Sequence, residues 1–168
     1  CVCLFDLRLE IADRALTALP PQLGRLVDLV TLIASNNALS ALPDEVGTCL
    51  SKLRNLEAAG NELTELPASL SGLGALQVVD VSNNHLASIA PLSALDSLVA
   101  VNVGINELTE LPLAYERLEH MQTLGAASNK IATFPPGIGA LQQLTALDLS
   151  SNAIEQVPIE LGGLTVKK

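Results

Sequence analysis

The sequence is poor in aromatic and basic residues. Its 168 residues include no Trp, one Tyr and two Phe, although hydrophobic residues make up 49% of the chain. A core must therefore be built almost wholly from Leu, Ile, Val and Ala. Only 9 Lys and Arg stand against 18 Asp and Glu, which gives a formal net charge of −9. Without a basic surface or aromatic rings on which bases stack, the composition argues against nucleic acid as a ligand and against anionic membranes.

Signals for a membrane span and for an oxidising compartment are also missing. No apolar run approaches the roughly 18 residues that a transmembrane helix requires. The three cysteines, Cys1, Cys3 and Cys49, do not make an even disulfide framework, and no Asn-x-Ser/Thr glycosylation sequon occurs. These absences favour a reducing compartment, and we expect a cytoplasmic, intracellular protein.

Catalytic and metal-binding signatures are absent from the sequence. Neither His85 nor His120 has the Ser, Cys or Asp neighbours of a catalytic triad. Cys1 and Cys3 form a Cys-x-Cys pair, but only Cys49 could join them, and no clustered His completes a zinc set. There is no glycine-rich phosphate loop of recognised spacing. We therefore predict no enzymatic activity, no cofactor and no metal.

One pattern recurs along the whole chain. The stretch LRNLEAAGNELTELP, from Leu53 to Pro67, places apolar residues at fixed offsets around a central Asn61. A degenerate copy is centred on Arg14, and successive central positions are separated by 23, 24, 23, 22, 23 and 23 residues. Constant spacing over seven copies predicts a stacked array of one structural unit. The central asparagines are Asn37, Asn61, Asn84, Asn106, Asn129 and Asn152.

The pattern resembles the leucine-rich repeat, LxxLxLxxNxLxxLPxxLxxL, whose period is 20–29 residues. Its second half is similar to the intracellular Ras-suppressor and plant Ras-group type. That half appears as LPPQLGRL from Leu19, LPASLSGL from Leu66, FPPGIGAL from Phe134 and VPIELGGL from Val157. The resemblance covers residues 1–168 as a single domain of about seven repeats. It implies an α/β solenoid: a curved right-handed superhelix with a parallel β-sheet on its concave face and short helical or 3₁₀ segments on its convex face.

The repeat pattern has a direct physical explanation. Its LxL core predicts a short strand with alternate residues on opposite faces, and neighbouring repeats pair these strands in parallel, about 4.8 Å apart. The chain turns at the central Asn, where backbone polar groups have no strand partner. An amide both donates and accepts, so we predict that the six asparagines bond the turns of adjacent repeats in a structural ladder.

Departures from the pattern predict irregular places. Arg14 and Asp6 replace the consensus Asn and Leu of the first copy, which indicates an edge repeat. One extra residue between Asn37 and Asn61 predicts a bulge near Cys49, and the copy after Asn84 is one residue short, which predicts a tighter convex segment. Both ends lack the polar outer face that caps a solenoid, so we expect a fragment of a longer chain, or ends covered by flanking sequence or a partner.

The resemblance implies a protein partner on the concave face, where the non-leucine strand positions lie. The row between the two strand leucines is largely acidic, and the row two residues later is formed by Ala, Ser and Gly. Such a face would admit a basic segment or a helix. The alternative is that the charges are only solvated and the small residues only relieve crowding. The candidate partner-binding residues are Arg8, Glu10, Ile33, Glu57, Asp80, Asn102 and Asp148.

A second acidic feature lies just after the central Asn in two repeats. Glu62 with Glu65 and Glu107 with Glu110 occupy identical positions, which predicts one edge of the solenoid. That edge is either a solvated rim or a second docking site.

Three functions agree with these expectations. The first is a non-catalytic protein–protein interaction scaffold. The second is the targeting domain of a larger signalling enzyme, such as a phosphatase, cyclase or kinase. The third is an architectural subunit that packs inside a large complex through its convex side or its edges.

Overall fold

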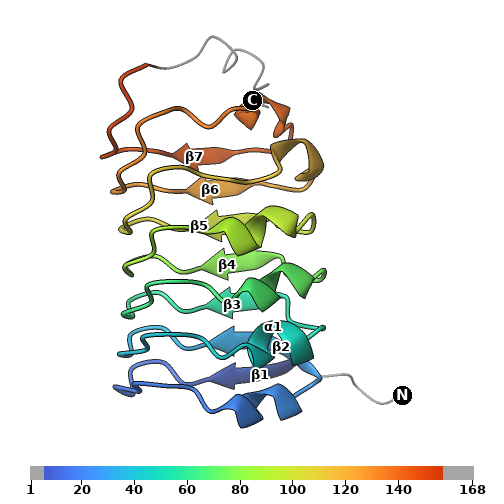
Figure 1. The fold of residues 1–168 in the computed structure, drawn as a ribbon. Coiled ribbons are helices and arrows are strands. Elements are labelled where there is room, and N and C mark those ends of the chain that lie inside the picture. The colour runs from blue at the N-terminus through green and yellow to red at the C-terminus, as the bar shows by residue number, and fades with distance from the viewer. Residues whose placement is uncertain (1–5, 157–168) are drawn as a thin grey trace.

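The computed structural model describes residues 6–156 as a stack of seven short parallel strands in a single sheet, in chain order (Figure 1). Cys1, Cys3 and the repeat copy from Val157 lie outside the described residues. The predicted parallel sheet is confirmed, and β1 lies at its edge as expected for the first repeat. The strands are β1 (Leu7–Glu10), β2 (Leu29–Ile33), β3 (Asn55–Glu57), β4 (Val78–Asp80), β5 (Ala100–Asn102), β6 (Thr123–Gly125) and β7 (Ala146–Asp148).

A short helical segment follows each of the first six strands, and all of them pack on the same side of the sheet (Figure 1). We call that side the convex face and the opposite, solvent-facing side of the sheet the concave face. These elements confirm the leucine-rich repeat solenoid. The segments are η1 (Pro21–Arg25), α1 (Glu45–Cys49), η2 (Ala68–Gly72), η3 (Ala90–Ala94), η4 (Tyr115–Arg117) and η5 (Ile138–Ala140), where η marks a 3₁₀ helix.

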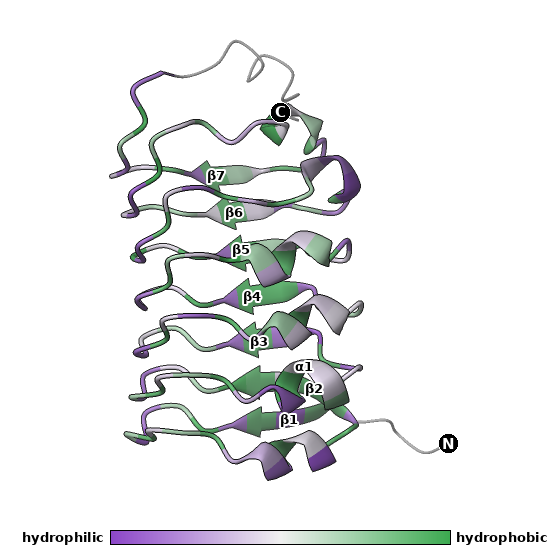
Figure 2. Ribbon diagram, in the orientation of Figure 1, coloured by the Kyte–Doolittle hydropathy of each residue, from purple (hydrophilic) through white to green (hydrophobic). Residues whose placement is uncertain are grey.

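The core lies between the sheet and the helical segments. Strand registers align the middle residue of each strand, for example Leu56 with Val79 and Val79 with Val101, and these three side chains are buried. In Figure 2 most strands are hydrophobic along part of their length and hydrophilic towards the arrowhead, and the helical segments contain both kinds of residue. Tyr115 is the one aromatic side chain in this buried set: its hydroxyl donates to the Leu111 carbonyl oxygen at 2.9 Å, and burial raises its pKa.

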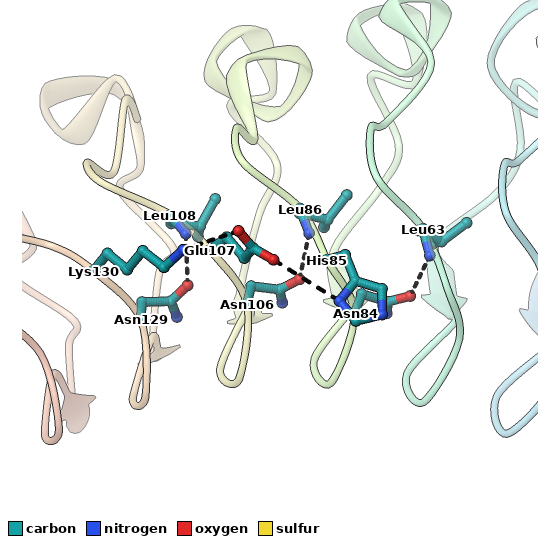
Figure 3. Close-up of polar contacts among 9 residues, drawn as sticks. All are labelled: Leu63, Asn84, His85, Leu86, Asn106, Glu107, Leu108, Asn129 and Lys130. Carbon is teal, nitrogen blue, oxygen red and sulfur yellow. Dashed lines mark hydrogen bonds and ion pairs between the residues drawn. The ribbon is translucent and has the colours of Figure 1, made fainter.

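The asparagine ladder forms as predicted. The Oδ1 of Asn84 accepts from the Leu63 N–H of the preceding repeat at 2.9 Å, and its Nδ2 donates to the carbonyls of Ala58 and Val81, both at 3.0 Å. The Ala58 carbonyl also accepts from Asn61, so neighbouring asparagines share an acceptor. Figure 3 shows three successive asparagines of the ladder, Asn84, Asn106 and Asn129, each accepting a hydrogen bond from a backbone N–H of the preceding repeat. The same Oδ1 and Nδ2 bonds recur at Asn37, Asn61, Asn106, Asn129 and Asn152.

The residue before each central position adopts the left-handed backbone conformation. This geometry favours Gly, Asn and Asp, because a Cβ is crowded there. Ile105 is the one β-branched residue among these positions, with φ +54° and a side chain that is 57% exposed. A β-branched residue therefore occupies a strained position without the benefit of burial. The positions are Asp13, Asn36, Gly60, Asn83, Ile105, Ser128 and Ser151.

Replacing Ile105 with Asn is expected to raise the free energy of unfolding by about 0.5–1 kcal/mol, because Asn tolerates positive φ and little apolar burial is lost. Chemical denaturation measures the change. The control is Ile105→Val, which keeps the β-branched strain and should bring no such gain. A less stable Asn variant would show that the Ile105 side chain makes a contact that outweighs its strain.

Two predicted irregularities take forms that differ from the prediction. The extra residue near Cys49 does not make a bulge: it widens the convex segment to the α-helical turn α1, in which the Thr48 N–H reaches the Asp44 carbonyl at 3.0 Å. An α-turn takes 3.6 residues where a 3₁₀ turn takes 3.0, so it absorbs the insertion. After Asn84, η3 is as long as η2, but it begins directly after Ile89, whereas Pro67 separates Leu66 from η2, so the missing residue is lost at the start of the convex segment.

Candidate protein-binding face

The strand registers align most of the predicted binding residues in one line across the sheet. Each residue pairs with the next in the order Glu10, Ile33, Glu57, Asp80, Asn102, Gly125 and Asp148, which we call the acidic row. Arg8 lies in the adjacent row, opposite Thr31, and its guanidinium contacts Glu10 at 3.0 Å. The fold therefore brings together the full predicted set. Whether the set binds a partner is a separate question.

The residues of the acidic row are not equally available. Glu10, Asn102 and Asp148 are exposed, whereas Glu57 and Asp80 are half-buried. Ile33 is only 8% exposed. It lies between the longer side chains of Glu10 and Glu57 on the neighbouring strands. Ile33 thus contributes little surface to a partner, although it lies in the row.

Two aspartates of the acidic row are fixed by the serine two residues later. Asp80 Oδ1 accepts from the backbone N–H of Ser82 at 3.0 Å and from its hydroxyl at 2.7 Å, and Asp148 repeats both distances with Ser150. The hydroxyl and backbone bonds from Ser150 lower the pKa of Asp148. The sequence signal was an Asp-x-Ser spacing at the end of β4 and β7, which the repeat pattern alone did not single out. Both carboxylates are consequently held in place by their serines.

The Asn102 side chain on β5 links its own repeat to the preceding repeat, which contains β4. Its Oδ1 accepts from the Gly104 N–H at 3.2 Å, as the aspartates accept from their serines, and its Nδ2 donates to Asp80 Oδ2 at 3.2 Å. A Cβ added at Gly125, the next position of the row, would lie 3.1 Å from Asn102 Oδ1. A residue without a side chain is therefore favoured at position 125. Its absence of a side chain leaves a shallow depression in the acidic row between Asn102 and Asp148.

The concave face is hollowed over β4 to β7. A cavity of about 420 Å³ lies there, open to solvent and lined mainly by apolar atoms. Its lining includes Val78, Ala100 and Ala146 from one row, with Asp80 and Asp148 from the acidic row. The cavity comes from short side chains on neighbouring strands, so it is a preformed depression rather than a gap between elements.

The edge that follows the asparagines carries mixed charge. Backbone bonds align Glu62, His85, Glu107 and Lys130 in successive turns, as the matched positions of Glu62 and Glu107 predicted. Lys130 Nζ lies 2.9 Å from Glu107 Oε2, and His85 Nδ1 lies 4.0 Å from Glu107 Oε1 (Figure 3). The hydrogen bond and charge of Lys130 lower the pKa of Glu107. Part of the predicted acidic edge is thus neutralised.

This shift predicts a pH dependence with a definite sign. Because the folded pKa of Glu107 lies below its ordinary 4.5, the Glu107–Lys130 pair stabilises the fold above that pH and loses its contribution as the pH falls through the lowered value. Replacing Lys130 with Met should return the pKa of Glu107 towards 4.5, as NMR titration would show. High salt should shrink the difference, because the pair is exposed. An unchanged pKa in the Met variant would contradict the ion pair.

Residues 6–156 include both histidines of the chain, His85 and His120. Neither histidine there is hydrogen-bonded to a Ser, Thr or Cys, and these residues contain no group of three His, Cys, Asp or Glu arranged to hold a metal ion. Cys49 is a half-buried free thiol. None of the helices in this part of the chain has the length and apolar character needed to cross a membrane.

The family model described as "Leucine rich repeat" matches residues 27–86, and the same strand–turn–helix unit continues through the described residues on both sides. The chain belongs to the leucine-rich repeat family. Its seven strands and their ladder are those of a leucine-rich repeat solenoid, a fold whose proteins generally mediate protein–protein interactions.

Two relatives match nearly the whole chain. An adenylate cyclase of Podospora anserina is 33% identical over 160 residues, which are 94% of this leucine-rich repeat chain and 8% of that protein. A plant intracellular Ras-group-related LRR protein of Oryza sativa subsp. japonica is 30% identical over 161 residues, which are 94% of this chain and 36% of that protein. The chain therefore spans only a small part of each relative.

A solved structure confirms the fold. The LRR ectodomain of the membrane receptor kinase GASSHO1/SCHENGEN3 from Arabidopsis thaliana superposes with a TM-score of 0.82 at 30% sequence identity. The match covers 92% of this leucine-rich repeat chain and 19% of that chain. Repeats of one architecture thus occur in proteins with different names, so the particular function must be argued from this chain's own surface.

Proposed function

We propose that this chain is a non-catalytic protein–protein interaction scaffold and that it binds its partner through the concave face. The observation that carries the proposal is the acidic row, which crosses all seven strands and places polar side chains on five of them, beside an open apolar hollow. Binding surfaces of proteins commonly combine an apolar centre with a few polar groups held in fixed orientations.

The charge of the face supports a basic partner. Glu57, Asp80 and Asp148 lie in the acidic row, and β2 to β7 contain neither Lys nor Arg. Their field would steer a cationic segment towards the sheet and disfavour nucleic acid. An intracellular, cytoplasmic location is part of the proposal, and its support is the likeness to the plant intracellular relative and the absence of a glycosylation sequon.

Affinity purification with quantitative mass spectrometry tests this function. The test variant is Glu57→Lys/Asp80→Lys/Asp148→Lys, which reverses three charges on the concave face. The matched control is Glu65→Lys/Glu110→Lys/Glu116→Lys, which reverses three exposed charges outside that face. Circular dichroism and thermal denaturation establish that both variants are folded.

The proposal expects at least one wild-type partner to be depleted by about 10-fold or more with the concave variant and retained with the control, since juxtaposed like charges cost several kcal/mol. If every partner survives the concave variant, that face is not the binding site. If the control loses the partner instead, the site is the edge that carries Glu65 and Glu110 or the convex η4, and an architectural role through those surfaces becomes the better account.

A second function is favoured by one comparison. The chain matches 8% of the length of the Podospora anserina adenylate cyclase, so repeats like these occur inside a protein named for its catalysis. On this alternative the scaffold would be the targeting domain of a larger signalling enzyme. The coding sequence that flanks these repeats tests it: a catalytic domain in the same reading frame supports the alternative, and a stop codon on both sides removes it.

A further inference from the structure

We propose that the hollow over β4 to β7 binds an extended segment of the partner protein that carries two cationic side chains about four residues apart. This inference rests on the proposed function, because it assumes that the concave face is the binding face. It adds the conformation of the bound segment, its charge and the spacing of its charges.

The spacing follows from the two carboxylates. Asp80 lies on β4 and Asp148 on β7, three strand positions apart in the same row. Parallel strands are about 4.8 Å apart, so the two positions are separated by about 14 Å. An extended chain advances about 3.3 Å per residue and covers that distance in about four residues. Side chains at i and i+4 of an extended segment also point to the same side.

The spacing of the two carboxylates favours an extended chain over a helix. A helix rises about 1.5 Å per residue, so it would need about nine residues to cover roughly 14 Å. At 3.6 residues per turn, two side chains nine residues apart point to opposite sides of the helix, and both could not reach the sheet. The floor of Val78, Ala100 and Ala146 is low and apolar, which suits small apolar side chains between the two cations.

The carboxylates are already oriented for this contact. Ser82 and Ser150 hold Oδ1 of Asp80 and of Asp148, and Oδ2 of Asp148 has no hydrogen-bond partner among the described residues. Oδ2 of Asp80 accepts one bond, from Asn102 at 3.2 Å. None of the four strands contributes a cation that would compete. Because the acceptors are held before binding, little side-chain ordering remains when a cation arrives.

Fluorescence anisotropy with synthetic peptides and the whole chain tests the inference at low ionic strength. The probe is labelled Gly-Lys-Val-Pro-Val-Lys-Gly, whose proline is compatible with an extended chain and disrupts a helix. One comparison peptide replaces both Lys with Glu, and another places the two Lys only two residues apart. The test variant is Asp80→Asn/Asp148→Asn, in which each amide can still accept from its serine. The matched control is Glu65→Gln/Glu110→Gln.

The expected result is saturable binding of the probe that is weakened about 10-fold by the double Asn variant and unchanged by the control. The closely spaced peptide should bind about 3-fold more weakly, and the Glu peptide should not bind. No binding of the probe, equal binding of the two spacings, or equal loss in both variants would overturn the inference. If the purified partner is still lost with the charge-reversed concave face, the proposed function stands and only the extended basic segment is wrong.

Discussion

Replacing Asn84 with Ala is expected to lower the free energy of unfolding by about 2–4 kcal/mol, a large part of the stability of an ordinary domain. The Asn84 side chain is buried, and its loss leaves the Leu63 N–H without an acceptor. The Ala58 carbonyl keeps its bond from Asn61, but the Val81 carbonyl then depends on Asn106 alone. Buried groups that lose their partners cost about 1–3 kcal/mol each.

Chemical denaturation of Asn84→Ala, followed by circular dichroism, measures this effect. Asn84→Asp separates the accepting role of the amide from its donating role. It keeps an acceptor for the Leu63 N–H and loses the bonds that Nδ2 donates to the carbonyls of Ala58, Val81 and Ser82. It also turns a carboxylate towards these carbonyl oxygens, so it should be no more stable than the Ala variant. The matched control is Asn55→Ala on the concave face, whose side chain makes no hydrogen bond within residues 6–156, with an expected change within about 0.5 kcal/mol. A similarly small change at Asn84 would show that the ladder does not stabilise the fold.

Replacing Gly47 with Ala is expected to destabilise the protein by about 2–3 kcal/mol or more. Gly47 lies in α1, where Ala ordinarily favours a helix over Gly by about 1 kcal/mol. Here an added Cβ would overlap the backbone carbonyl group of Ser69, on the neighbouring η2. Backbone cannot rotate away as a side chain can, so the second and third repeats must separate. Steric overlap therefore outweighs helix propensity.

The control for Gly47 is Gly74→Ala. Nothing lies within 4 Å of a Cβ built at Gly74, and its φ is not in the left-handed region. This variant should be neutral or more stable by up to about 1 kcal/mol, because Ala restricts the unfolded chain. Thermal denaturation compares the two variants directly. If Gly47→Ala is as stable as Gly74→Ala, the close packing of α1 on η2 is wrong.

The fold was predictable because the repeat fixes both period and register. A spacing near 23 residues between asparagines places Glu57 beside Asp80 whatever the intervening turn contains. The alternation of strand side chains then separates the buried Leu56 and Val79 from the acidic row on the opposite face of the sheet. The ladder was equally predictable, since an amide at the strand end is the group that can satisfy both a donor and an acceptor of the next repeat.

What the sequence could not indicate depends on contacts between neighbouring repeats. The burial of Ile33 depends on which side chains flank it, and the neutralised charge of Glu107 depends on Lys130 in the next turn. The extra residue near Cys49 could be absorbed by a bulge or by a wider helical turn, and only packing decides between them. The strain at Ile105 was hidden because the consensus leaves that position unspecified.

The candidate site was predictable as a surface but not as a binding mode. The acidic row follows from register alone, whereas the hollow requires that Ala100, Gly125 and Ala146 all be small on adjacent strands. The hydrogen bonds from Ser82 and Ser150 to the two aspartates follow from an Asp-x-Ser spacing in the sequence. That spacing predicts the bonds only once the conformation of the turn after the strand is known. The hollow and these hydrogen bonds, which the repeat pattern alone does not predict, give the acidic row its shape and fix its carboxylates.

Carboxyl footprinting of the chain, free and bound to its purified partner, tests the central claim most directly. A water-soluble carbodiimide couples an amine to exposed Asp and Glu, and mass spectrometry gives the labelling rate of each. The account predicts that binding slows labelling at Glu57, Asp80 and Asp148 by several-fold and leaves Glu65, Glu110 and Glu116 unchanged. Protection of the second group with free labelling of the first would show that the partner binds away from the concave face.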